Sequence, residues 1–121
     1  MIFFGNFNSQ NQNSGGLLSL IAGIAITGNI ILEIDSGGNN KCTITYTGSY
    51  QNGKSFSFVP VVSQNSTPGM ITISGDIEQQ KFYFNVQCTS LDSIAVNSQI
   101  LGTYITMNPG DSGVVRATRF K

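Results

Sequence analysis

Residues 109–115 read Pro-Gly-Asp-Ser-Gly-Val-Val and contain a string that is typical of a catalytic nucleophile. The residue types of Gly110-Asp111-Ser112-Gly113 surround the reactive serine of many serine proteases, in which a histidine takes the proton of the hydroxyl. The 121 residues include no histidine, so Ser112 lacks the usual general base. The same residue types are typical of a turn between two strands. We therefore predict a turn here and no hydrolase activity.

Carboxylates and thiols are the other groups that could do chemistry. Glu33 and Asp35 lie two residues apart, as a glycosidase pair could, but beside a Ser-Gly-Gly turn they are typical of a solvated face that guards a sheet edge. Cys42 and Cys88 have no histidine to act as a base or to complete a metal site. The sequence thus predicts a protein that is not an enzyme, with no catalytic residue, no metal site and no cofactor.

The two cysteines share the apolar parity of the strands that the sequence predicts around them. Cys42 alternates in step with Ile44, and Cys88 does so with Phe84. Two interpretations stay open. A buried disulfide would stabilise the fold by about 4 kcal/mol for a loop of this length, whereas two reduced thiols would act as small core residues.

The composition limits the partners of this chain. Six basic residues balance six acidic ones, and only 10% of the residues are charged, against about a quarter in ordinary soluble domains. Six basic residues cannot neutralise many phosphates, so we expect no nucleic-acid partner. A surface that is polar but almost uncharged repels its own copies weakly, and this favours self-association.

Short runs of β-branched and aromatic residues, separated by Gly, Asn, Pro and Ser, predict about eight to nine strands and no helices. The fold class is therefore all-β, an antiparallel β-sandwich with a jelly-roll or Ig-like outline. Asn52-Gly53 predicts a hairpin turn, and Pro60 predicts a strand end, a bulge or a sheet edge. The expected strands cover residues 21–28, 29–35, 41–48, 54–62, 70–75, 81–88, 93–97, 100–107 and 114–120.

The apolar stretch 17–26 has the length of the core of a signal peptide. It lacks a preceding basic region, and it is too short to cross a bilayer. We expect no cleaved signal peptide and no membrane span. If the protein works outside a cell, or on the surface of a cell, spore or virion, it is exported by another route.

The N-terminal segment predicts an extended arm. Its apolar side chains are followed by a polar, uncharged stretch that is typical of a linker, so residues 1–16 are expected to be arm and linker and residues 17–121 the sandwich domain. Such an arm can fold back as an edge strand of its own domain or dock on a neighbouring copy, and we favour the neighbour. Removing residues 1–16 should then leave a folded monomer. The arm residues are Ile2, Phe3, Phe4 and Phe7.

These features favour a non-catalytic structural subunit that assembles with copies of itself into a fibre, tube or coat. The alternative is a carbohydrate-binding, lectin-like module, in which polar loop residues and tyrosines contact the sugar. Against it stands the absence of tryptophan. The residues that would make such contacts are Tyr50, Gln51, Asn52 and Tyr104.

The second half of the chain also resembles the small β-sandwich subunits of bacterial endospore appendages, which form pilus-like fibres. The resemblance lies in Ser93-Ile94, Gly102-Thr103-Tyr104 and Arg119-Phe120, and it covers about forty residues of low-specificity β sequence. It implies a fibre subunit whose N-terminal connector reaches into the next subunit. The subunits of that family carry cysteines in this arm and this chain has none, so its copies would be joined by strand pairing rather than by disulfides.

Overall fold

The computed structural model describes residues 1–10, 26–35, 37–47, 52–78, 80–107 and 110–121. The predictions on residues 11–25 and on Tyr50 and Gln51 lie outside these ranges. The described part contains nine strands and one short 3-10 turn, η1 (Leu91–Ser93). The strands are β1 (Ile2–Ser9), β2 (Thr27–Glu33), β3 (Lys41–Tyr46), β4 (Ser55–Phe58), β5 (Val61–Gln64), β6 (Ile71–Ile77), β7 (Gln80–Val86), β8 (Gln99–Met107) and β9 (Asp111–Arg119).

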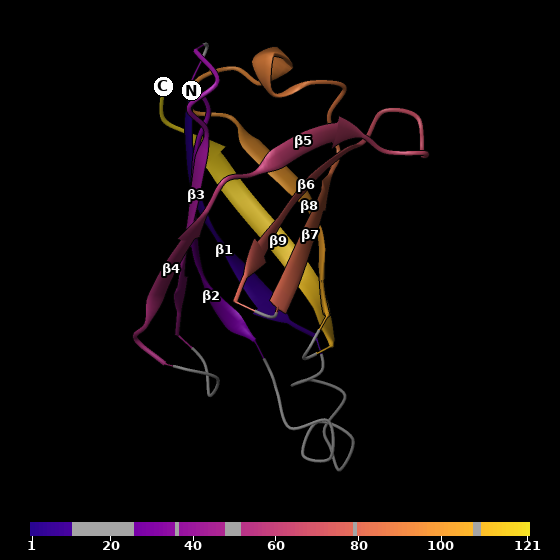
Figure 1. The fold of residues 1–121 in the computed structure, drawn as a ribbon. Coiled ribbons are helices and arrows are strands. Elements are labelled where there is room, and N and C mark those ends of the chain that lie inside the picture. Colours follow the sequence, from indigo (N-terminus) through magenta and orange to yellow (C-terminus); the bar gives the residue numbers. More distant parts are fainter. Residues whose placement is uncertain (11–25, 36, 48–51, 79, 108–109) are drawn as a thin grey trace.

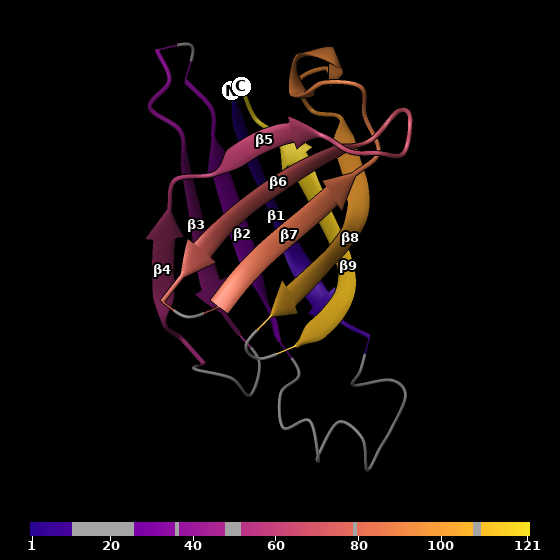
Figure 2. The same cartoon turned by 45° about the vertical axis from the view of Figure 1, so that its right-hand side comes forward.

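All nine strands belong to one antiparallel sheet in the order β4-β3-β2-β1-β9-β8-β7-β6-β5. The sheet curls on itself, so that β2, β3 and β4 face β5, β6 and β7 across the interior (Figures 1 and 2). Both chain termini lie at one end of the curled sheet, which we call the upper end, and the opposite end is the lower end. The all-β class and the predicted number of strands are confirmed.

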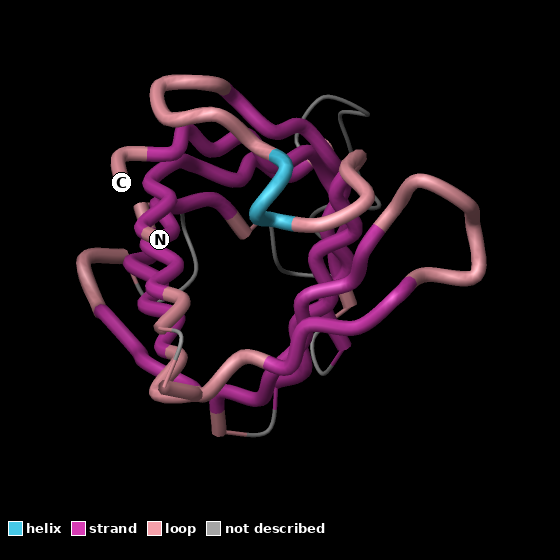
Figure 3. Tube along the Cα trace, turned by 90° about the horizontal axis from the view of Figure 1, so that it is seen from above, coloured by secondary structure: helices cyan, strands magenta, loops and turns pink. Residues whose placement is uncertain are grey.

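The core follows from the two-residue period of the strands, which puts alternate side chains on the inner face. In Figure 3 the strands surround a central space, which these inner side chains fill. Phe82 stacks on both Phe58 and Phe84, at ring-centroid distances of 6.3 and 5.9 Å. An apolar cavity of only about 20 Å³ remains among the core side chains that line it. The interior is thus a packed core.

The N-terminal segment is an interior strand, not an arm set apart from the domain. β1 pairs with β2 on one side and with β9 on the other, so Phe3 and Phe7 lie in the chain's own core. The boundary that we predicted at residue 16 therefore does not separate β1 from the sheet. β1 lies in the sheet because its alternating residues put an apolar face toward the core. The sequence alone could not show which strands this face would pack beside. Removing residues 1–16 would now open the sheet rather than leave a folded monomer.

The connections differ from the predicted outline in three further places. The expected strands 21–28 and 29–35 are not divided after Gly28, because β2 runs through Gly28 and Asn29. Neighbouring strands run as a meander on either side of the β1–β9 pair, without the crossings of a jelly-roll or Ig-like sandwich. Residues 93–97, predicted as a strand, instead form the end of η1 and a turn, in which Asn97 has a φ of 71°. The expected strand 54–62 is divided at Pro60 into β4 and β5, which lie at the two edges of the sheet, as the proline predicted.

Replacing Phe7 by alanine tests the position of β1. The Phe7 ring packs edge-on against Tyr104 at a centroid distance of 5.3 Å and is fully buried, so Phe7→Ala should lower the free energy of unfolding by about 3–5 kcal/mol. Phe4 points outward and is 42% exposed, so Phe4→Ala should cost less than about 1 kcal/mol. Urea unfolding of both variants measures the difference. Equal effects would contradict an interior β1.

Candidate functional site

The slot that β1 occupies is the first candidate site, because the sheet is incomplete without this strand. The slot is tight: a Cβ atom added to Gly5 would lie 1.8 Å from the carbonyl oxygen of Arg116 on β9. Glycine at this position lets the two backbones approach closely. Seventeen residues, 10–26, connect β1 to β2, although antiparallel neighbours need a connection of only about two to five residues.

A buried carboxylate at the lower end holds the two ends of this connection. Asp111 Oδ1 accepts a hydrogen bond from Ser9 Oγ at 2.8 Å, and Oδ2 accepts one from the Ile26 amide at 3.0 Å. The Tyr104 hydroxyl lies 2.8 Å from Oδ2 and 2.7 Å from the main-chain oxygen of Ile26. Asp111 thus links β1, the start of β2, β8 and β9 through one side chain, and we call this group of four residues the Asp111 cluster.

The sequence did not point to this cluster, although one signal was available. Asp111 has the same parity in β9 as Val115 and Ala117, and Ser9 has the same parity in β1 as Phe7, so all five lie on the inner face. An acidic residue in step with core residues predicts a buried, hydrogen-bonded carboxylate. Burial of the Tyr104 hydroxyl, its hydrogen bond to Asp111 and the charge of that residue raise the pKa of Tyr104 above its ordinary value.

A second buried polar pair lies at the start of β7. The Tyr46 hydroxyl donates a hydrogen bond to Gln80 Oε1 at 2.5 Å, and both residues are buried. The Nε2 atom of Gln80 has no hydrogen-bond partner in the described part of the chain. Gln80 shares the parity of Phe82 and Phe84, so this position too could have been recognised from the sequence as an inward polar residue.

Two predicted roles change with this geometry. Tyr104, one of the candidate sugar contacts, has no exposed surface and its ring packs in the core, so it is not accessible to a sugar; of the other three, only Asn52 is described, and it is exposed. Ser112 and Asp111 are consecutive residues of β9 and point to opposite faces. The turn that we predicted for the Gly-Asp-Ser-Gly string ends at Gly110, and Asp111 begins the strand.

Cys42 and Cys88 are both free thiols and both are buried. Of the two interpretations left open by the sequence, the structure therefore has two reduced thiols in the core and no disulfide between them. Burial raises the pKa of the Cys42 thiol to about 12, and it raises that of Cys88 as well. Both thiols are therefore protonated at neutral pH, which makes them poor nucleophiles.

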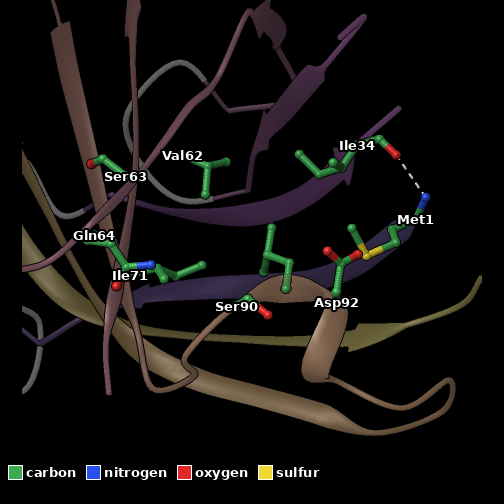
Figure 4. Close-up of a pocket in the computed structure, with 9 residues that line it drawn as sticks. Met1, Ile34, Val62, Ser63, Gln64, Ile71, Ser90 and Asp92 are labelled. Atoms are coloured by element: carbon green, nitrogen blue, oxygen red, sulfur yellow. Dashed lines mark hydrogen bonds between the residues drawn. The ribbon is translucent and has the colours of Figure 1, made fainter. Parts of the chain in front are cut away.

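A pocket of about 290 Å³ opens at the upper end, beside β5 (Figure 4). Val62 and Ile71 line one side, and Met1 and Ile34 line the other, where the Met1 nitrogen donates to the Ile34 oxygen at 2.8 Å. Polar atoms lie at its rim, among them the Asp92 carboxylate. No aromatic side chain lines this pocket, so it lacks the stacking platform that a sugar site would use.

Among the described residues, no group of three or more His, Cys, Asp or Glu side chains is placed to hold a metal ion. The described part of the chain also has no helix of the length and hydrophobicity that crossing a membrane requires. Comparisons with protein-family models, with curated protein sequences and with solved structures found no match to this chain.

Removing the Tyr104 hydroxyl tests the Asp111 cluster. Tyr104→Phe leaves the ring in the core but removes the hydroxyl that donates its one hydrogen between two buried oxygens, so the free energy of unfolding should fall by about 1–3 kcal/mol. Tyr83 is half-buried on the outer face of β7, and Tyr83→Phe is the matched control, with an expected change within about 0.5 kcal/mol. Urea unfolding at neutral pH compares the two; equal losses would count against a stabilising cluster.

Because the pKa of Cys42 is raised, we expect the free energy of unfolding to fall at alkaline pH. Its pKa is about 12 in the folded chain against 9.0 for a free thiol, so between these values the unfolded chain ionises first and binds fewer protons. The contribution of the buried, neutral Cys42 thiol to the free energy of unfolding is complete below pH 9 and is lost as the pH rises toward 12. Urea midpoints measured across this range should fall less steeply for Cys42→Ala than for the unmodified chain. Parallel curves would show that the thiol does not contribute.

Proposed function

We propose that this protein is a non-catalytic structural subunit that assembles with copies of itself by exchanging β1. In the assembly, β1 of one chain fills the slot between β2 and β9 of a neighbour. The observation that carries the proposal is the combination of an interior strand at the chain's N-terminal end with a connection of 17 residues to its partner strand. Exchange of an identical element preserves every contact of the strand, so it has a low energetic cost.

The length of the connection sets the distance between exchanging copies. Fully extended, 17 residues span about 56 Å. In an exchanged pair, Ser9 of the donor would bind Asp111 of the acceptor, and Ile26 would remain with its own chain. The lower ends of two neighbouring sheets must therefore lie within about 56 Å of each other. Sequential exchange from copy to copy gives an open fibre, and reciprocal exchange gives a closed dimer.

The composition supports the same proposal. The formal net charge is zero and charged residues are scarce, so copies repel one another weakly. The resemblance to endospore appendage subunits agrees with a strand that passes between subunits, and it remains a prediction. The carbohydrate-binding alternative has less support, because Tyr104 is buried and the pocket at the upper end has no aromatic lining.

A pair of cysteines across β1 and β9 distinguishes exchange from pairing within one chain. Asn6 and Arg116 lie opposite each other, and both are exposed. The double variant Asn6→Cys/Arg116→Cys, refolded and oxidised, should give a ladder of covalent multimers on a denaturing gel if β1 is exchanged sequentially, and a covalent dimer if the exchange is reciprocal. Electron microscopy of the unmodified chain should then show regular fibres.

The matched control keeps one of these cysteines and moves the other to β8. Leu101 also lies opposite Arg116 and is exposed, but β8 and β9 belong to the part of the chain that does not exchange. Leu101→Cys/Arg116→Cys should therefore give monomers with an internal disulfide. Monomers from both variants would show that β1 stays in its own chain, and would overturn the proposal.

A further inference from the structure

β5 is an edge strand that carries no charged residue to guard it against pairing. Its four residues pair with β6 on one side, and among the described residues no strand pairs with its other side. All four are exposed, and none is charged. Short length, prolines, lysines, bulges or a covering element guard edge strands, because their free backbone groups are a template for another strand. Of these, β5 has a short length of four residues and a preceding proline, Pro60, but no lysine or other charge.

The other edge of the sheet is protected by its own fold. β4 approaches β6, and the ring of Phe58 lies over Gly75, where an added Cβ atom would come within 1.9 Å of the ring. β4 and β5 both lack a paired strand on their outer side among the described residues, but only β4 is approached there by another strand, so β5 is the more open edge.

The inner face of β5 is only partly covered. Val62 lies opposite Ile73 and has its inward parity, yet Val62 is 40% exposed while Ile73 is buried. It faces the pocket at the upper end, whose far side is formed by Met1 and Ile34 (Figure 4). An additional strand along β5 would cover Val62 and place its own inner side chains over this pocket.

A second copy of the same strand meets these requirements. When two identical strands pair antiparallel about a two-fold axis perpendicular to the sheet, opposite residues must share a face. The sum of their residue numbers is then even, so Val62 faces either Val62 or Gln64 of the second copy. In either pairing register, the inner face of one sheet continues into the inner face of the other across the β5–β5 contact. Because β5 has no charge and the chain has a formal net charge of zero, like-charge repulsion does not oppose this pairing.

We propose that β5 pairs antiparallel with β5 of a second copy, so that two nine-stranded sheets join into one continuous sheet. This contact goes beyond the exchange of β1, since it uses a different strand, and either one can exist without the other. In an assembly that also exchanges β1, it would join neighbouring fibres side by side.

Sedimentation velocity over a wide range of concentrations tests this contact in the full chain. The unmodified protein should form dimers or larger species. Val62→Lys places two lysines near the junction, and it should raise the dissociation constant about tenfold or more. Leu101→Lys also converts an exposed apolar residue to lysine, but on the outer face of β8, and it should behave like the unmodified protein. Circular dichroism establishes that both variants are folded.

Cross-linking at β5 separates this contact from β1 exchange. If the two-fold axis passes Val62, oxidised Val62→Cys should give a covalent dimer; if it passes Ser63, Ser63→Cys should do so. Val59→Cys, exposed but outside β5, should remain monomeric. Dimers of Val62→Cys or Ser63→Cys that form while the β1–β9 cysteine pair gives only monomers would support β5 pairing and reject β1 exchange. Monomers from both β5 variants, or dissociation constants that Val62→Lys leaves unchanged, would overturn β5 pairing.

Discussion

The whole sheet depends on the pairing of the chain's first strand with its last. β1 and β9 lie side by side at the middle of the sheet, and every other strand is added outward from them along two meanders. Without β1, the flanking strands β2 and β9 would each have a bare edge, and Phe3 and Phe7 would be missing from the core. The contact also joins residues more than one hundred positions apart, so its formation carries a large loop-closure cost.

The large loop-closure cost means that the β1–β9 contact forms late, and this gives the proposed exchange of β1 a physical basis. The other hairpins have shorter connections, whereas β1 is joined to β2 through 17 residues and reaches β9 only when the two ends of the chain meet. During that interval the slot between β2 and β9 is an open pair of edges, which any copy of β1 fits equally well. Under the proposed exchange, local concentration would decide which copy enters, and the 17-residue connection would let a neighbour compete with the chain's own strand.

The Asp111 cluster explains how the lower end tolerates a carboxylate in the core. A buried polar group destabilises the fold unless hydrogen bonds replace those it made with water. Here the bonds come from Ser9, Ile26 and Tyr104, which lie on separate strands or at the start of one. The requirement that all of them be present at once fixes the register of β1 against β9, because a slip of one residue would turn Ser9 to the outer face. The cluster thus specifies the alignment of the central pair, whichever copy supplies β1.

Much of the sheet could be predicted from local sequence, because a strand's parity and its turns are local properties. The inward positions of Cys42, Ile44 and Phe84 followed from alternation alone, and Asn52-Gly53 and Pro60 marked where strands turn or end. The position of β1 could not be predicted in this way. An apolar segment before a polar stretch has the same composition whether it docks in its own sheet or in that of another copy. Which of the two occurs depends on the strands that it pairs with, and the segment's own sequence does not identify them. The edge position of β5 was indicated only in part: Pro60 predicted a strand end, a bulge or a sheet edge, and the order of strands in the assembled sheet shows that β5 is at its edge. In this chain, therefore, the local pattern determines which residues face inward, and non-local pairing determines which strands are free to meet another copy.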